Sequence, residues 1–326
     1  MYLGNNIDGF RNDITKGLRN PQQKSTPSKY LYDTLGSQLF ELITEQPEYY
    51  PTRTEINILK NNSSELIKNI SKDIVLIELG SGSSKKTQYL FHEILRKQEK
   101  LYYFPIDISM NFLDSIVTSL ETLNKNLVVR GIPDDYINGI KQCNNILFEN
   151  NIYFDTFSRL IVFFGSSIGN FEPEEARDFL KQIRLNIHDK DFLLVGFDLI
   201  KDVDLIEPAY NDKAGFTSKF NLNLLNRINN ELRGNFDMRK FHHHAFYNSS
   251  KNRVEMHIKS RVDQTISILT IDENFHFDAG ETIHTENSYK YDLTKIENLA
   301  SRSGFAVDKV FSDKNDWFNL VLFRPC

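Results

Sequence analysis

Cysteine is scarce in this sequence, and long apolar runs are missing. The 326 residues include two cysteines, Cys143 and Cys326, and no Cys-x-x-Cys pair, which excludes a disulfide framework and cysteine-based zinc or iron–sulfur sites. The three-cysteine cluster of radical enzymes is excluded as well. No stretch of about 18 apolar residues occurs, and the N-terminus has no cationic start followed by an apolar run. We therefore expect a cytoplasmic protein without a membrane span.

An excess of basic residues is also missing. Lys and Arg number 39 against 44 Asp and Glu, which gives a formal net charge of −5 and a pI near 5.9. The broad basic surface that binds nucleic acid is therefore absent. We expect a small-molecule substrate, no nucleic-acid or membrane partner, and a monomer. The length and the 40% hydrophobic content allow one large core or two smaller ones, and the length favours two domains.

A glycine turn follows the first strongly apolar run. Ile74-Val75-Leu76-Ile77 leads into Glu78-Leu79-Gly80-Ser81-Gly82, a pattern typical of a strand that ends at a nucleotide-type turn. The glycines let backbone N–H groups approach a ligand near the positive N-terminus of a following helix. A dinucleotide fingerprint and a P-loop both need further residues that are absent here. The turn therefore suits a cofactor without pyrophosphate, such as S-adenosylmethionine, although a plain structural turn has the same local pattern.

The next apolar run ends in an acidic residue. Tyr102 to Ile106 is followed by Asp107, at the position that hydrogen-bonds ribose hydroxyls in doubly wound folds. This carboxylate favours nucleoside binding. Lys85 and Lys86 stand where we expect the following helix to start, and positive charge there opposes the helix dipole. A ligand role for one of them and a solvated pair both remain open.

Apolar runs alternate with helical spacing between about residues 66 and 200. This alternation predicts an α/β fold with a doubly wound parallel sheet that is covered on both faces. A helix is expected to open at Glu172-Pro173-Glu174-Glu175, with proline in its first turn and acids near its positive end. The expected strands are 74–77, 101–106, 127–129, 159–164 and 192–198.

The pattern changes after residue 200. We expect an amphipathic helix around 220–228 and strands with period two around 253–258, whereas 305–311 and 317–323 are typical of a closing strand pair that returns to the first sheet. Near the N-terminus, Pro47-Glu48-Tyr49-Tyr50-Pro51 is expected to form a stiff loop. The predicted domains are 66–200 plus 290–326, and a smaller α+β domain made of 1–65 plus 201–289.

Two further motifs have chemical and structural interpretations. His242-His243-His244 suggests a metal, but consecutive strand residues point to opposite faces, so we expect no metal site. Gly165-Ser166-Ser167-Ile168-Gly169-Asn170 follows an apolar strand and places an amide where a doubly wound sheet opens onto its ligand. Asn170 there suits an amine or carboxylate, and a small-residue turn with a left-handed Asn is equally compatible. The segment that contains Tyr210 is likewise compatible with an ordinary turn in which the tyrosine only packs.

Taken in order, several motifs resemble one family. They are Tyr30-Leu31-Tyr32-Asp33, Leu35-Gly36-Ser37, Pro47-Glu48-Tyr49-Tyr50-Pro51-Thr52-Arg53-Thr54-Glu55, Glu78-Leu79-Gly80-Ser81-Gly82, Gly165 to Phe171, and Ala209-Tyr210-Asn211-Asp212. The chain resembles the histidine-specific S-adenosylmethionine-dependent methyltransferases from about residue 28 to residue 325. That family makes Nα-trimethylhistidine (hercynine) in ergothioneine biosynthesis. The resemblance implies a class I methyltransferase (Rossmann-like) sheet with a second substrate-binding domain, and S-adenosyl-L-homocysteine as co-product.

The resemblance also implies which residues bind the cofactor. Gly80 would pack against its methionine moiety, Lys86 would pair with its carboxylate, and Asp107 would hold the ribose. Asp135 would take the adenine amino group, with Tyr136 as its aromatic neighbour. This chain departs from the compact Gly-Asp-Phe-type turn of the family, so Asp134 and Asp135 both remain candidates, and we favour Asp135 because Tyr136 follows it.

For the substrate, the resemblance implies that Asn170 and Tyr210 bind the α-amino and α-carboxylate groups. Glu286 and Ser288 would bind the imidazole. The residues that complete the implied pocket are Tyr32, Tyr49, Thr217 and Met256. The implied catalytic residues are Tyr32, Asn170 and Tyr210, with Tyr32 or a water near Asn170 as acceptor of the amine proton.

Related fungal enzymes methylate tryptophan derivatives, so the substrate needs a separate argument. An indole would leave a buried Glu286 and Ser288 unsatisfied, at roughly 1–3 kcal/mol per group. Their presence favours histidine over another aromatic amino acid. From their spacing alone, Glu286 and Ser288 would be expected to lie on a solvated face of a strand. An alternative function of a different class is that of a regulatory subunit that binds the cofactor without catalysing a reaction.

Overall fold

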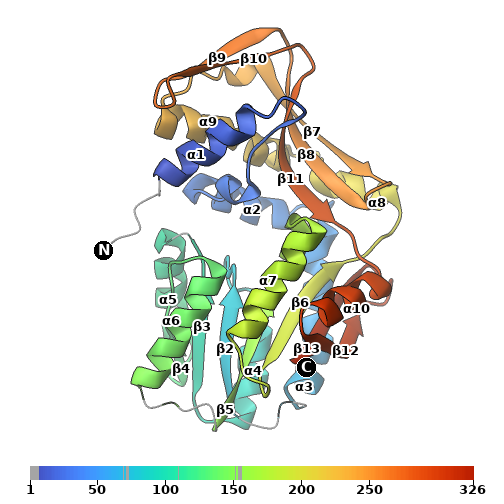
Figure 1. The fold of residues 1–326 in the computed structure, drawn as a ribbon. Helices are drawn as coiled ribbons and strands as arrows, with labels where there is room; N and C mark the ends of the chain where they lie inside the picture. Colours follow the sequence, from blue (N-terminus) through green and yellow to red (C-terminus); the bar gives the residue numbers. More distant parts are fainter. Residues whose placement is uncertain (1–6, 69, 71–72, 109, 151, 153–155) are drawn as a thin grey trace. The chain divides into compact units, whose positions relative to one another are not determined.

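The computed structural model describes residues 7–68, 70, 73–108, 110–150, 152 and 156–326. Two compact units make up the chain (Figure 1). The first unit consists of Met1–Tyr49 and Asp202–Ser288, and the second consists of Tyr50–Lys201 and Tyr289–Cys326. Each unit therefore contains two separate stretches of sequence.

A seven-stranded sheet forms the centre of the second unit. Its strand order is β12-β13-β6-β5-β2-β3-β4, parallel from β6 to β4, with β13 antiparallel to both of its neighbours. The strands are β2 (Asp73–Leu79), β3 (Leu101–Ile106), β4 (Leu127–Val129), β5 (Phe157–Phe163), β6 (Phe192–Asp198), β12 (Phe305–Ser312) and β13 (Phe318–Pro325). The doubly wound sheet and the return of the closing strand pair to it are thus confirmed.

Helices cover both faces of this sheet. Alternate residues of β2 enter different cores: Val75 and Ile77 pack with one set of helices, and Ile74 and Leu76 with the other. The first set is α6 (Tyr136–Glu149), α7 (Pro173–Leu185) and α10 (Leu293–Arg302), and the second is α3 (Tyr50–Lys68), α4 (Gln88–Lys97) and α5 (Met110–Leu123). Within the described ranges, no helix has the length and apolar character needed to cross a membrane.

The prediction of a stiff loop through Pro51 is wrong, because α3 already begins at Tyr50. Proline is compatible with the first turn of a helix, where its missing N–H has no intrahelical partner to lose. The predicted domain boundary between residues 65 and 66 falls inside α3. This helix packs as a whole with the second unit, since Ile58, Leu59 and Leu66 lie in one of the two cores of the sheet.

The first unit combines helices with a smaller sheet. The sheet has the order β1-β11-β8-β7, and β9 and β10 form a separate antiparallel pair. Asp33 caps α2 by accepting from the Gly36 N–H at 2.7 Å, and it also accepts from Asn223 of α9 at 2.8 Å, which joins the two helices. The elements are α1 (Ile7–Leu18), β1 (Lys24–Ser25), η1 (Ser28–Leu31), α2 (Thr34–Thr44), α8 (Val203–Ile206), η3 (Glu207–Tyr210), α9 (Phe216–Leu232), η4 (Met238–Lys240), β7 (Phe241–Asn248), β8 (Arg253–Ser260), β9 (Gln264–Ile268), β10 (Glu273–Phe277) and β11 (Thr282–Tyr289).

Candidate active site

The glycine turn after β2 forms a close-fitting cradle. Gly80 has φ +69°, and its N–H donates to the Ile106 carbonyl at 2.9 Å. A Cβ at Gly80 would lie 3.2 Å from the Tyr136 hydroxyl, so a larger residue would fill the space. The Ser81 hydroxyl is buried and has no hydrogen-bond partner among the described residues. A backbone that admits close approach beside an unsatisfied buried hydroxyl fits a polar ligand such as the methionine moiety of S-adenosylmethionine.

Asp107 and Tyr136 line the same turn. The Gly82 N–H donates to Asp107 Oδ2 at 3.3 Å, which fixes the carboxylate at the end of β3. The Tyr136 ring packs edge-on against Phe163, with centroids 5.4 Å apart. Burial, and then the charge of Asp107, raise the pKa of Tyr136, so its hydroxyl stays protonated at neutral pH. The structure therefore brings Gly80, Asp107 and Tyr136 together, and their binding of the cofactor stays a prediction.

Asp134 and Asp135 lie at the start of α6. Asp135 is the N-cap residue: it accepts from the Asn138 N–H at 2.9 Å, and its side chain is exposed. The carboxylate of Asp134 instead accepts from the side chain of Gln142. The preference for Asp135 as the adenine-binding carboxylate remains a prediction.

Lys86 lies in the turn before α4 rather than inside the helix. Its Nζ is 2.8 Å from Oε2 of Glu55, which is fully buried. Both Glu55 oxygens also accept from the Gly165 N–H, at 3.0 and 2.9 Å. Glu55 thereby ties α3, the turn before α4 and the end of β5 to one another. Sequence reasoning quoted Glu55 only as part of a motif and assigned it no role.

Glu78 is a second buried acid beside this turn. Thr87 Oγ1 donates to its Oε1 at 2.5 Å, and the Tyr103 hydroxyl donates to its Oε2. Burial is the largest effect and raises the pKa of Glu78 to about 7, against the lowering effect of these two hydrogen bonds. The first residue of the glycine motif is thus a structural acid that titrates near neutral pH.

Asn170 ends the short 3₁₀ helix η2 (Ser167–Asn170) after β5. The left-handed residues of this segment are Gly165 and Ser166, with φ +76° and +56°, so a left-handed Asn170 is not observed. Gly169 lies against Tyr289, since a Cβ on it would be 2.8 Å from the Tyr289 carbonyl oxygen. This close packing fixes the backbone that presents Asn170.

A buried ionic cluster lies at the end of β6. Oδ2 of Asp198 accepts from the Tyr50 hydroxyl at 2.8 Å and is 2.7 Å from Nζ of Lys290, while Oδ1 is 2.5 Å from Nζ of Lys201. Although burial acts in the opposite direction, the two ammonium groups lower the pKa of Asp198. The apolar strand pattern gave no indication that these four residues meet.

In the first unit, aromatic rings connect several residues implied for the substrate. Tyr32 packs edge-on against Phe40, and Phe40 against Tyr49, with centroids 5.6 and 6.0 Å apart. Tyr49 in turn lies 6.5 Å from Tyr210, whose hydroxyl donates to Ser288 Oγ at 2.7 Å in a buried contact. Four of the predicted residues therefore form one continuous cluster.

Thr217, Met256 and Glu286 also belong to the first unit. Asp212 accepts from the N–H groups of Phe216 and Thr217, at 2.8 and 2.7 Å, and so fixes the start of α9. Met256 on β8 and Glu286 on β11 are buried. Asp212 is a positioning residue to which sequence reasoning assigned no role, because the N-cap position itself is Gly215 and the acid lies three residues before it.

Comparisons with known proteins agree over nearly the whole chain. The sequence model of a family described as histidine-specific methyltransferase, SAM-dependent, matches residues 10–325. A histidine N-alpha-methyltransferase from Mycolicibacterium smegmatis is 34% identical over 97% of this chain and 94% of that protein, and one from Mycobacterium tuberculosis is 35% identical over 96% and 94%. Among solved structures, magnesium protoporphyrin IX methyltransferase from Synechocystis is similar with a TM-score of 0.45, 8% identity, and coverage of 92% of this chain and 98% of that chain.

Proposed function

Because this chain belongs to the histidine-specific, S-adenosylmethionine-dependent methyltransferase family, we propose that it methylates the α-amino nitrogen of L-histidine, three times, to give hercynine. The observation that carries the proposal is the identity of 34–35% to two histidine N-alpha-methyltransferases over at least 96% of the chain. The enzyme uses S-adenosylmethionine and releases S-adenosyl-L-homocysteine. We further propose that it acts as a monomer on a small-molecule substrate. The net charge of −5 supports a small molecule over a nucleic acid as the substrate.

The cofactor is proposed to bind at the glycine turn of the second unit. Gly80 admits the methionine moiety, Lys86 pairs with its carboxylate, and Asp107 holds the ribose hydroxyls. Asp135 and Tyr136 are proposed to contact the adenine. The positive φ of Gly80 and the unsatisfied Ser81 hydroxyl support this assignment, since both leave room and hydrogen-bonding capacity for a ligand.

The substrate is proposed to bind through both ends of the amino acid. Asn170 and Tyr210 hold the α-amino and α-carboxylate groups, while Glu286 and Ser288 hydrogen-bond the imidazole nitrogens. Tyr32, Tyr49, Thr217 and Met256 complete the pocket. The burial of Glu286 and Ser288 supports imidazole over indole, because a buried carboxylate and hydroxyl gain from a ring with two nitrogen atoms.

Bound S-adenosylmethionine supplies an electrophilic methyl group. The protein's task is then to present the α-amino nitrogen in its neutral form and in the correct orientation, which accounts for most of the catalysis in such transfers. Tyr32, or a water held by Asn170, is proposed to accept the ammonium proton before each transfer. With the carboxylate and the imidazole both anchored, the amine can be presented again after each methylation without loss of the substrate's register.

Mass spectrometry of the purified chain with S-adenosylmethionine tests the proposal. Separate incubations contain histidine, tryptophan or tyrosine, and mass gains of one, two and three methyl groups are scored. A trimethylated product from histidine alone is expected. Methylation of tryptophan or tyrosine but not histidine would contradict the assigned roles of Glu286 and Ser288. Tight binding of the cofactor with no turnover would instead support a non-catalytic subunit.

A further inference from the structure

A row of three histidines crosses neighbouring strands of the first unit. His244 on β7 lies opposite His257 on β8, with ring centroids 6.4 Å apart, and His257 lies 4.8 Å from His284 on β11. Residues at paired positions on adjacent strands share one face of a sheet. The sheet therefore brings together histidines that are far apart in the sequence. The consecutive residues His242, His243 and His244 cannot converge in this way, because neighbours on one strand point to opposite faces.

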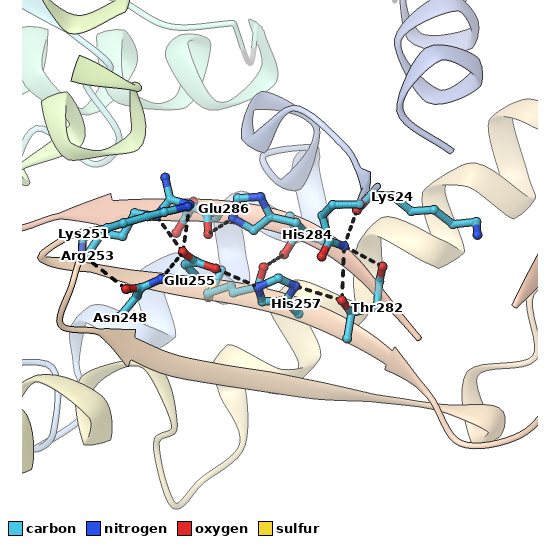
Figure 2. Close-up of polar contacts among 12 residues, drawn as sticks. Lys24, Asn248, Lys251, Arg253, Glu255, His257, Thr282, His284 and Glu286 are labelled. Atoms are coloured by element: carbon cyan, nitrogen blue, oxygen red, sulfur yellow. Dashed lines mark hydrogen bonds and ion pairs between the residues drawn. The ribbon is translucent and has the colours of Figure 1, made fainter. Parts of the chain in front are cut away.

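A carboxylate lies beside two of these imidazoles. Glu255 precedes His257 by two residues on β8, so both side chains lie on the same face. Oε2 of Glu255 is 3.4 Å from Nε2 of His257, and one ligand atom from each of Glu255, His257 and His284 lies within 4.8 Å of the others. Figure 2 shows the three side chains directed toward one another from the two strands.

Neighbouring groups hold each of the three side chains in place. Nδ1 of His257 is 3.2 Å from the Thr282 hydroxyl, and Nε2 of His284 is 3.2 Å from the Glu286 carbonyl oxygen. Arg253 donates to Oε1 of Glu255 at 2.8 Å, which leaves Oε2 directed at His257 (Figure 2). Partners of this kind orient the ligands of protein metal sites.

We propose that Glu255, His257 and His284 bind one divalent transition metal ion of the Zn²⁺ class. Two imidazoles and one carboxylate are the donor set that such ions prefer, whereas Mg²⁺ and Ca²⁺ prefer oxygen ligands. Bonds of about 2.1 Å place the ligand atoms of a tetrahedral site roughly 3.4 Å apart. Small side-chain rotations are therefore enough to close the site. Three protein ligands leave a fourth position for water.

A bound ion would link β8 to β11 beside the residue assigned to the imidazole of the substrate. His284 is two residues before Glu286 on β11, so the ion would hold this part of the strand against β8. Its expected effect is on the stability of the first unit. The inference does not depend on methyl transfer, and each can fail without the other.

Zn²⁺ binding by the full chain tests the site. The protein, freed of any affinity tag and of metal by a chelator, is dialysed against Zn²⁺, and the metal content is measured by mass spectrometry. One ion per chain is expected with Zn²⁺ and none with Mg²⁺, together with a higher melting temperature in Zn²⁺. Failure of the wild-type chain to retain a stoichiometric ion would overturn the proposal.

Single substitutions separate this site from other histidines. His257→Gln and His284→Gln are each expected to weaken Zn²⁺ binding at least tenfold and to remove the rise in melting temperature. The matched control His276→Gln changes an exposed histidine on β10 and is expected to bind as wild type does. Melting curves in chelator establish that each variant folds, and Glu255→Gln serves as a third variant. Wild-type affinity in His257→Gln and His284→Gln, or loss of binding in His276→Gln, would contradict the proposal.

Discussion

The carboxylate of Asp198 lies 2.7 Å from the ammonium group of Lys290, and both side chains are buried. Lys201 and Tyr50 contact the same carboxylate. The chain passes between the two units at three places, after Tyr49, after Lys201 and after Ser288. Each of these crossings lies within two residues of a side chain that contacts Asp198. One carboxylate therefore anchors every covalent connection between the units.

Asp198→Asn is expected to lower the free energy of unfolding by about 3–5 kcal/mol, because it leaves two buried ammonium groups without their counter-charge. Chemical denaturation followed by circular dichroism measures the change. Asp189→Asn is the control, since Asp189 is an exposed carboxylate paired with Arg184 and its loss should change stability by less than about 1 kcal/mol. Equal effects of the two substitutions would contradict the anchoring role.

Glu78 is expected to make stability depend on pH. Its pKa in the folded chain is about 7 against 4.5 for the unfolded reference, so its contribution is fully present below pH 4.5 and is lost as pH rises toward 7. The loss is on the order of 3 kcal/mol. Glu78→Gln should flatten the profile of unfolding free energy over this window, whereas exposed Glu149→Gln should leave it as in wild type. Identical profiles in all three proteins would show that Glu78 does not titrate in this range.

Lys86 and Lys85 offer a matched pair for cofactor binding. Lys86→Met should weaken binding of S-adenosyl-L-homocysteine by about 10-fold to 100-fold, as expected for loss of a charge-assisted hydrogen bond. Lys85→Met, which changes the exposed neighbour, should bind as wild type does. Isothermal titration calorimetry gives both affinities. A loss in the Lys85 variant alone would exchange the roles of the two lysines.

Glu286→Gln should reduce kcat/KM for histidine by about 10-fold to 100-fold, since the imidazole N–H would lose a charged acceptor. Steady-state assays with histidine measure the effect. Glu281→Gln is the control, because Glu281 pairs with Lys24 just before β11 and has no assigned role in the site. Unchanged turnover of histidine by the Glu286 variant would contradict the proposed hydrogen bond between Glu286 and the substrate imidazole.

The sequence allowed the second unit to be predicted closely, and the reason is its burial on both faces. Parallel strands such as β3 and β6 consist of nearly continuous apolar runs, so their ends could be placed to the residue. The glycine turn and Asp107 could be predicted as well, because each directly follows one of these apolar runs. The start of α3 was missed because prolines flank Tyr49 and Tyr50, and proline favours a helical first turn as well as a loop.

Contacts that depend on tertiary packing could not be predicted from local patterns. Glu55 on α3 accepts from the Gly165 N–H after β5, and Glu255 lies near His284 of a different strand. Neither pair has a sequence spacing that marks it. Residues brought together by the fold are the ones for which a single sequence gives least information.

The order of the strands has a consequence for synthesis on the ribosome. β13 lies between β12 and β6, yet in the sequence it follows the whole of the first unit. A nascent chain that has emerged only as far as Ser288 therefore exposes β6 as an unpaired sheet edge, the kind of surface on which aggregation begins. Completion of the sheet must wait until β13 has been synthesised, and the growing chain is open to chaperone binding during that interval.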